Sequence, residues 1–118
     1  MSNKMIGHFE DKPLTEAYCQ RIESYLKELP NIGKEHKSQL SYKVKRKFLW
    51  MWTYEKTRDG ILYLSLMLDE EIKDDRIHNV SQVSAKRWNH SIVIKDKEEI
   101  ESSWFQDLLL KGYAFAGR

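Results

Sequence analysis

Two apolar segments on either side of a turn dipeptide decide the fold of this chain. Residues 48–54 read Phe-Leu-Trp-Met-Trp-Thr-Tyr, residues 59–60 read Asp-Gly, and residues 61–68 read Ile-Leu-Tyr-Leu-Ser-Leu-Met-Leu. Each segment is apolar at consecutive positions, which is typical of a strand covered on both faces in the middle of a sheet. Asp-Gly favours a tight hairpin because glycine accepts a positive φ. We therefore expect two central antiparallel strands.

Further strands are predicted on both sides of this pair. Residues 40–45 alternate between apolar and polar side chains, as a half-exposed strand does. Residues 45–47 (Lys-Arg-Lys) read as a polar turn, and residues 88–94 read as the last strand. Residues 69–87 follow no clear period, so we expect an irregular crossing there with a short helix or strand.

Helices are predicted at the two ends of the chain. Pro13 suits a first helical turn, and apolar side chains recur at helical spacing from there to residue 29. Asp96 and Glu99 have the spacing of an N-cap box for a final helix that runs to about residue 116. The sequence thus predicts an α+β fold, with an antiparallel sheet of about four to five strands packed against an N-terminal and a C-terminal helix.

Composition fits one domain over residues 1–118, a length that buries a core without disulfides or metal. The net charge of +2 is too small to indicate a polyanionic partner by itself. Cys19 is the only cysteine, which excludes an intramolecular disulfide and a cysteine-based zinc site. No segment is apolar over the roughly 20 residues of a membrane span, and the first residues lack a signal-peptide run. We expect a cytoplasmic protein without a membrane partner or a cofactor.

Four stretches together resemble a known family. They are residues 37–42 (Lys-Ser-Gln-Leu-Ser-Tyr), 45–52 (Lys-Arg-Lys-Phe-Leu-Trp-Met-Trp), 87–90 (Arg-Trp-Asn-His) and 104–116. The chain resembles the DUF5655 family of prokaryotic domains over roughly residues 7–116. This family is distantly similar to the YdhG-like (DUF1801) domains, so the resemblance implies a small α+β fold with an antiparallel sheet. The family carries no established activity, so no catalytic residue is implied.

Two polar stretches beside apolar strands form the first candidate site. Lysine and arginine hold carboxylates or phosphates, and serine, glutamine and histidine add directed hydrogen bonds. The alternative is structural: Ser38 and Gln39 form a turn, while Arg87 and His90 pair with surface acids. The candidate ligand-binding residues are Lys37, Ser38, Gln39, Trp50, Arg87, Trp88 and His90.

A basic stretch interleaved with aromatic residues forms the second candidate. Positive charges neutralise phosphates and aromatic rings stack on bases, which together bind single-stranded nucleic acid. The alternative is that the aromatic residues are buried in a central strand and the cations keep a hairpin tip in solution. The candidate nucleic-acid-binding residues are Lys43, Lys45, Arg46 and Lys47.

The acidic residues between 69 and 75, with His78, offer oxygen-rich ligands to a metal ion. Lys73 and Arg76 neutralise this charge, so a solvated loop is the simpler interpretation. No Gly-x-Ser-x-Gly elbow, phosphate-binding glycine loop or His-Glu-x-x-His helix occurs. We therefore assign no catalytic residue and no metal ligand.

The sequence favours a binding module rather than an enzyme. The leading hypothesis is a sheet pocket for a small anionic ligand or motif, in which Lys37 and Arg87 hold the anion and His90 orients the ligand. The alternative is nucleic-acid binding through the basic hairpin 43–47. The third hypothesis is a homo-oligomeric or partner-docking domain, marked by an exposed apolar patch.

Overall fold

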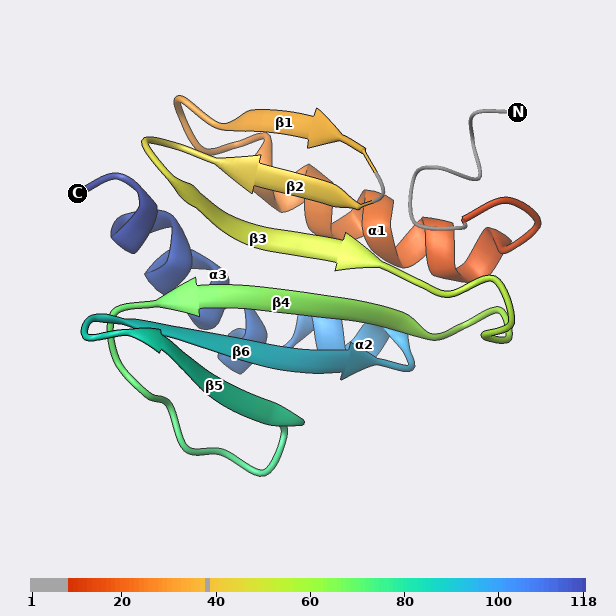
Figure 1. The fold of residues 1–118 in the computed structure, drawn as a ribbon. Coiled ribbons are helices and arrows are strands. Elements are labelled where there is room, and N and C mark those ends of the chain that lie inside the picture. Colours follow the sequence, from red (N-terminus) through yellow and green to blue (C-terminus); the bar gives the residue numbers. More distant parts are fainter. Residues whose placement is uncertain (1–8, 38) are drawn as a thin grey trace.

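The computed structural model describes residues 9–37 and 39–118, and in these residues one six-stranded sheet packs against three helices (Figure 1). The strand order is β1-β2-β3-β4-β6-β5, and every neighbouring pair is antiparallel. The α+β class is therefore confirmed. The elements in chain order are α1 (Pro13–Leu26), β1 (Gly33–His36), β2 (Leu40–Lys43), β3 (Lys47–Trp52), β4 (Leu62–Leu68), β5 (Asn79–Ser84), β6 (Arg87–Ile94), α2 (Lys97–Glu101) and α3 (Ser103–Ala116).

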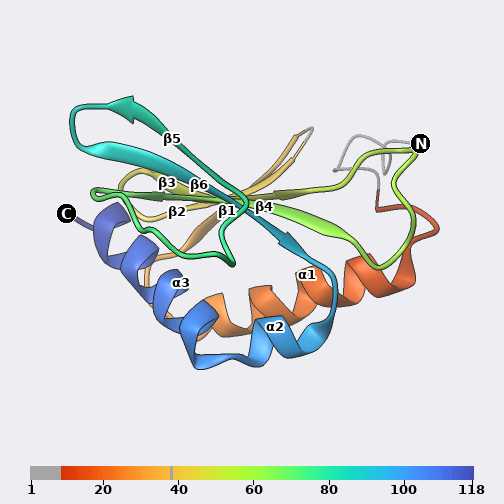
Figure 2. The same cartoon turned by 90° about the horizontal axis from the view of Figure 1, so that it is seen from below.

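The three helices lie on one face of the sheet, and the core lies between the two layers (Figure 2). The helix-facing positions of the two central strands are almost fully buried; they include Phe48, Leu49, Met51, Leu62, Leu64, Leu66 and Leu68. We expected these strands to be covered on both faces, but the helices of the described residues cover only one. Alternate side chains of a regular strand point to opposite faces, so Trp50 and Trp52 of β3 and the odd-numbered residues of β4 lie on the other face.

The sheet has more strands than the sequence indicates. β1 and β5 are its two edge strands, and neither has a continuous apolar alternation: β1 reads Gly-Lys-Glu-His and β5 reads Asn-Val-Ser-Gln-Val-Ser. Edge strands tolerate polar side chains on both faces because solvent reaches them. The strand predicted over residues 88–94 is confirmed as β6.

Helix ends follow local chemistry. Pro13 begins α1, as predicted, and the side chain of Asp96 accepts the Glu99 N–H at 3.1 Å at the start of α2. The predicted final helix is divided at Ser102, whose extended backbone (ψ 145°) ends α2. The Ser102 hydroxyl then caps α3 by accepting the Phe105 N–H at 3.2 Å. Serine competes for backbone hydrogen bonds, which explains why one predicted helix becomes two.

The Asp-Gly dipeptide lies in the β3–β4 hairpin, but the connection is longer than a two-residue turn, since it runs from Thr53 to Ile61. Gly60 adopts φ +97°, which a residue with a side chain rarely adopts. The Asp59 carboxylate accepts the N–H groups of Leu14 (3.2 Å) and Thr15 (2.9 Å) at the start of α1. The loop therefore caps a helix that is distant in sequence. Among the described residues, none of the helices has the length and apolar character needed to cross a membrane.

Candidate functional site

The face of the sheet opposite the helices, called the open face below, carries a group of aromatic side chains. Trp50 lies opposite Ser41 on one side and Ser65 on the other, and Trp52 lies opposite Tyr63. The rings of Trp52 and Tyr63 stack with centroids 6.1 Å apart and planes inclined by 23°. Tyr54, which is 54% exposed, lies 5.0 Å from Tyr63. We call Trp50, Trp52, Tyr54 and Tyr63 the open-face aromatics.

The open-face aromatics are only partly covered. Trp50, Trp52 and Tyr63 are half-buried, whereas their helix-facing neighbour Met51 is fully buried. A hollow of about 780 Å³ adjoins Trp52, Tyr54 and Tyr63 and reaches across the sheet to Val93. Large aromatic groups with one uncovered side next to a hollow are able to stack on a planar ligand.

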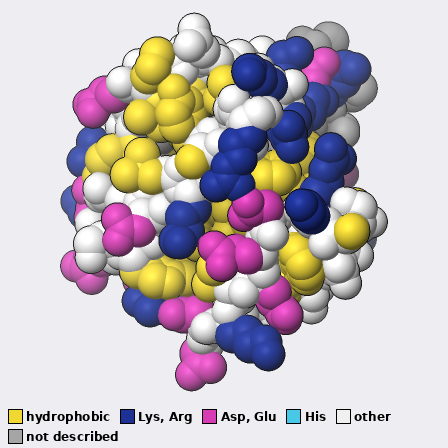
Figure 3. Space-filling view, turned by 90° about the vertical axis from the view of Figure 1, so that its left-hand side faces the viewer, with side chains coloured by type: hydrophobic (Ala, Val, Ile, Leu, Met, Phe, Trp, Pro, Cys, Tyr) yellow, Lys and Arg dark blue, Asp and Glu magenta, His cyan; other side chains and the backbone are white. Residues whose placement is uncertain are grey.

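Lysine side chains lie at one end of the open face. Lys43 pairs with Lys47 across the β2–β3 hairpin. The strand pairing is irregular after Tyr42, and this irregularity places Lys47 on the open face, the face that carries Ser41 and Trp50. Lys43, Lys45 and Lys47 are all exposed. Figure 3, which looks onto this end of the molecule, shows Lys and Arg side chains gathered at the upper right, on the side of β2 and β3. We call Lys43, Lys45 and Lys47 the basic margin.

One carboxylate lies beside the basic margin. Glu35 on β1 is 2.5 Å from the Nζ of Lys47 and 3.3 Å from the Nζ of Lys37. These two ammonium groups lower the pKa of Glu35, and the hydrogen bond from Lys47 has the larger effect. The carboxylate is therefore ionised at neutral pH. Glu35 therefore competes with any anionic ligand for the two lysines.

Arg46, the fourth predicted nucleic-acid residue, has a structural role. Its guanidinium donates to the carbonyl of Arg118 at 2.8 Å and lies 5.1 Å from the centre of the Phe115 ring. The neighbouring Lys45 N–H donates to the Ala116 carbonyl at 2.9 Å. These contacts fasten the β2–β3 turn to the carboxyl end of α3, where a cation is favourable. The other three predicted residues form the basic margin.

The structure does not bring the predicted ligand pocket together. Lys37 and Gln39 lie at the β1–β2 turn, Ser38 lies outside the described residues, and Arg87 begins β6 at the opposite end of the sheet (Figure 1). Trp50 is on the open face, but Trp88 and His90 are on the helix side of β6. β3 and β4 separate β2 from β6. The expectation that neighbouring strands unite these stretches is therefore wrong, because the strands are neither adjacent nor aligned at the same end.

His90 belongs to the core. It is fully buried, its Nε2 accepts the Ile72 N–H at 3.0 Å, and its Nδ1 lies 3.3 Å from the Leu66 carbonyl. The ring is thus neutral, with the proton on Nδ1. Burial lowers the pKa of His90, against the opposing effect of the Leu66 and Trp88 carbonyls. The surface-acid alternative also fails for His90, since both ring nitrogens contact backbone groups.

The acidic stretch after β4 is paired with basic side chains. Asp69 contacts Arg118, Glu70 lies 3.8 Å from Lys111, and Asp74 lies 2.8 Å from Arg76. Within residues 9–37 and 39–118, no three or more His, Cys, Asp or Glu side chains are grouped so that they could hold a metal ion. These contacts are those of a solvated loop fastened to α3.

Sequence reasoning missed Tyr54 and Tyr63. A signal for Tyr63 exists in β4: its even positions are all leucine, whereas its odd positions are Tyr63, Ser65 and Met67. The leucines face the helices, whereas Tyr63, Ser65 and Met67 lie on the open face. A strand that is apolar at every position can therefore still have two different faces.

Three comparisons with known proteins complete the description of the site. The model of the family described as "Domain of unknown function (DUF5655)" matches residues 6–116, nearly the whole chain. The comparisons with curated proteins and with solved structures gave no match.

Proposed function

The chain belongs to the DUF5655 family of domains of unknown function, and from its open face we propose that it binds single-stranded nucleic acid. The observation that carries this proposal is the position of Trp50, Trp52 and Tyr63 on the face that no helix of the described residues covers. Every base has a π face, so such a platform accepts single strands with little dependence on sequence. A duplex hides these faces and is a poorer ligand.

The basic margin supplies the complementary charge. Lys47 and Trp52 are the two ends of β3, so cations and aromatic rings follow one another along roughly 17 Å of strand. A strand of nucleic acid that crosses the face places phosphates at Lys43 and Lys47 and bases on the aromatic rings. Arg87, exposed at the far side of the same end of the sheet, offers a further phosphate contact.

This proposal keeps two residues of the small-anion hypothesis and excludes two others. Trp50 and Arg87 of that hypothesis lie on the open face, whereas Trp88 and His90 lie behind it and take no part. No catalytic residue is assigned. The cytoplasm of a prokaryotic cell, the location expected from the sequence, gives such a protein access to single-stranded DNA and RNA.

Binding is tested by fluorescence anisotropy with labelled single strands of about 12 nucleotides, across a series of salt concentrations. Each phosphate contact contributes about 0.7 to the slope of log K against log salt. The double variant Lys43→Gln/Lys47→Gln should bind more weakly, with a slope shallower by about 1.4. Its control is Lys27→Gln/Lys97→Gln, an equal change of charge at the C-cap of α1 and in α2, which should behave like the wild type.

Three results contradict the proposal. They are no binding at low salt, equal losses in the two double variants, and a preference for duplex over single strands. A solution mass well above the 14.1 kDa chain, with the open-face tryptophans shielded in the oligomer, points instead to an interface between copies of the chain.

A further inference from the structure

The edge of β6 is incomplete on the side of β5. β5 pairs with β6 only as far as Ser91, so Ile92–Ile94 have a partner, β4, on one side alone. The last bond on the β5 side joins the His78 N–H to the Ser91 carbonyl at 2.8 Å. Alternate residues of a strand direct their backbone groups to opposite neighbours. Val93 therefore directs its N–H and carbonyl to this side, where no described residue pairs with it.

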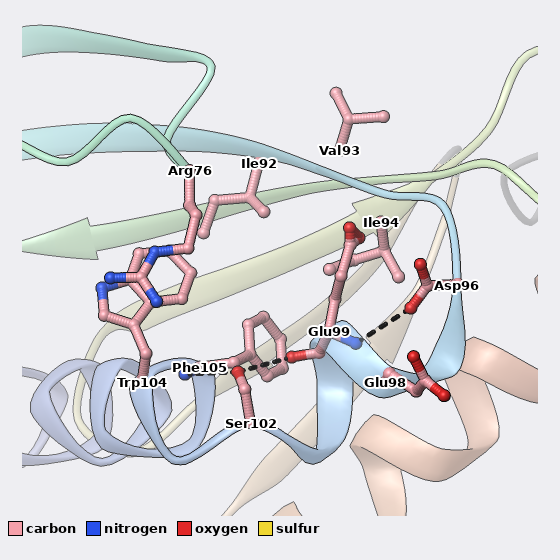
Figure 4. Close-up of a pocket in the computed structure, with 10 residues that line it drawn as sticks. All are labelled: Arg76, Ile92, Val93, Ile94, Asp96, Glu98, Glu99, Ser102, Trp104 and Phe105. Atoms are coloured by element: carbon pink, nitrogen blue, oxygen red, sulfur yellow. Dashed lines mark hydrogen bonds between the residues drawn. The ribbon is translucent and has the colours of Figure 1, made fainter.

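Two hollows lie on either side of this edge. On the helix side, a cavity of about 360 Å³ is lined by apolar groups of Ile92, Ile94, Trp104 and Phe105. On the other side, the hollow next to Trp52 and Tyr63 also reaches Val93, and it meets the helix-side cavity at Arg76, Ile92 and Glu99. In Figure 4, Ile92 and Ile94 point toward the helices and Val93 points the opposite way. A strand placed along the edge thus has a hollow for the side chains of each of its faces.

The charges around the helix-side cavity are mainly negative. Asp96, Glu98 and Glu99 lie at one end. Arg76 lies at the other end, but it forms an ion pair with Asp74 at 2.8 Å and its guanidinium lies 4.3 Å from the centre of the Trp104 ring. The carboxylates therefore dominate the field at the end of the cavity near Glu98.

We propose that the Ile92–Ile94 edge binds an extended peptide as an added antiparallel strand. The fitting sequence places two apolar side chains in the helix-side cavity, one side chain between them in the open-face hollow, and a lysine or arginine against the carboxylates. Backbone hydrogen bonds to Val93 supply affinity, and the two hollows supply specificity. This peptide site is separate from the basic margin, and its open-face hollow adjoins Trp52 and Tyr63 of the open-face aromatics.

The edge of β5 does not share these features. β5 is exposed at nearly every position, most of its side chains are polar, and none of its residues lines either of the two hollows beside Ile92–Ile94. Polar edges of this kind discourage strand addition. The Ile92–Ile94 edge combines open backbone groups with an apolar cavity, which is what strand addition requires.

The test uses isothermal titration calorimetry of the full chain with a capped peptide, Lys-Thr-Leu-Val-Leu-Thr-Lys. N-methylation of the central valine removes the N–H that faces Val93, so we expect affinity to fall at least about tenfold. N-methylation of the leucine before that valine blocks an N–H that points away from β6 and should change affinity less than about twofold. Equal effects of the two methyl groups would falsify strand addition.

Two protein variants complete the test. Val93→Pro removes the edge-directed N–H, a change that edge strands tolerate, and should abolish binding of the unmethylated peptide. If that variant does not fold, Glu98→Lys decides: it should weaken the lysine-ended peptide about tenfold but not a glutamine-ended version. Unchanged affinity in both variants overturns the proposal. A second result also overturns it: the wild type is a dimer that binds no peptide, and Val93→Pro converts this dimer to a monomer. In that case a second copy of the chain occupies the edge.

Discussion

The backbone N–H of Ile72 donates to the Nε2 of His90 at 3.0 Å, across the layer between the β4–β5 loop and the helix side of β6. The loop at this point contains no regular structure, and Ile77 is the only buried hydrophobic residue among residues 69–78, all of which the structure describes. The hydrogen bond from Ile72 to the neutral His90 ring is therefore a main contact that holds the β4–β5 loop against the sheet. A protonated Nε2 carries a hydrogen and cannot accept the Ile72 N–H, so protonation breaks this bond.

Stability should therefore depend on pH through His90. Its pKa in the folded protein is below the ordinary value of about 6.5, so the unfolded chain binds more protons between these two values. The stabilisation is complete above pH 6.5 and is lost as the pH falls toward the depressed pKa. We expect urea unfolding to show a lower free energy of unfolding at pH 5 than at pH 7.5.

The variant His90→Gln should reduce this pH dependence and should cost about 1–3 kcal/mol at pH 7.5, because buried backbone groups lose their partner. The same change at the exposed His78 is the control and should alter neither value. A His90→Gln protein with the full wild-type loss of stability between pH 7.5 and pH 5 contradicts this account.

Gly112 on α3 allows the helix to approach the sheet closely. A Cβ at this position would lie 2.9 Å from Leu66 Cδ1 and 2.9 Å from Phe48 Cδ2, both on nearly inaccessible side chains. Overpacking costs about 1–3 kcal/mol, whereas alanine gains about 1 kcal/mol in helix propensity. Gly112→Ala should therefore lower the free energy of unfolding by about 1 kcal/mol in urea titrations.

The control for this prediction is Gly117→Ala. The added Cβ there has its nearest neighbour at 3.6 Å, an ordinary contact, and the backbone φ is −91°. We expect a change within about 0.5 kcal/mol. A Gly112→Ala protein at least as stable as the wild type shows that Leu66 and Phe48 move apart without cost.

The sequence predicted the elements that bury apolar side chains, missed β1, and left β5 as one of two alternatives, a short helix or a short strand within residues 69–87. The leucines of β4 and the stripe of α1 carry a periodic signal because burial selects them. β1 and β5 are edge strands whose polar residues carry no such signal. The Trp50 and Trp52 side chains read as buried because hydropathy does not distinguish a covered face from an uncovered one. Only the strand register and the position of the helices make that distinction.

The sequence also did not reveal which residues contact partners that are far away in the chain. His90 and Arg87 are three residues apart, but His90 points into the core and Arg87 points to solvent. Arg46 lies within a run of exposed lysines, yet it contacts the end of a helix about 70 residues later. Such roles depend on which segments the topology brings together, and the residue type alone does not reveal them.

Asp59 should stabilise the start of α1. Lys12, at the N-cap position, makes no side-chain cap, and the Asp59 carboxylate accepts the first N–H groups of the helix in its place. Asp59→Ala should lower the free energy of unfolding by about 1 kcal/mol. Asp107→Ala, an exposed aspartate on α3, is the control. Equal stability of the two variants argues against the cap.

The Asp59 contribution should also depend on pH. Burial tends to raise the pKa of Asp59, but hydrogen bonds from the backbone of Thr15 and Leu14 outweigh it, and the pKa is lowered. The stabilisation is thus present above the ordinary aspartate pKa of about 3.9 and is lost as the pH falls through the depressed value. The difference between wild type and Asp59→Ala should therefore shrink below about pH 4.

Trp52 should supply stacking energy to nucleic-acid binding. Loss of one stacked base costs about 1–3 kcal/mol, so Trp52→Leu should weaken binding of a single strand about 5- to 150-fold in anisotropy titrations. Trp52→Phe keeps a ring and should retain most of the affinity. Trp104→Leu, on the helix side, is the matched control and should bind like the wild type. Equal losses for the leucine variants at positions 52 and 104 contradict the open-face assignment.

Glu35 should weaken nucleic-acid binding, so its removal should strengthen it. Its carboxylate holds Lys47 and Lys37, and both ammonium groups must leave it before they contact a phosphate. Glu35→Gln should raise affinity at low salt and steepen the salt slope by as much as about 0.7, the value for the one further phosphate contact that Lys37 can make. The cost in folding stability should be below about 1 kcal/mol because the ion pairs are exposed.

The control separates this local effect from a general change of charge. Glu28→Gln removes one exposed carboxylate from the turn after α1, away from the open face, and alters the net charge equally. If affinity depends on Glu35 as a competitor, Glu28→Gln leaves the slope unchanged while Glu35→Gln steepens it. A parallel rise in affinity for the two variants, with equal slopes, means that overall charge governs binding and that the basic margin does not form a localised site.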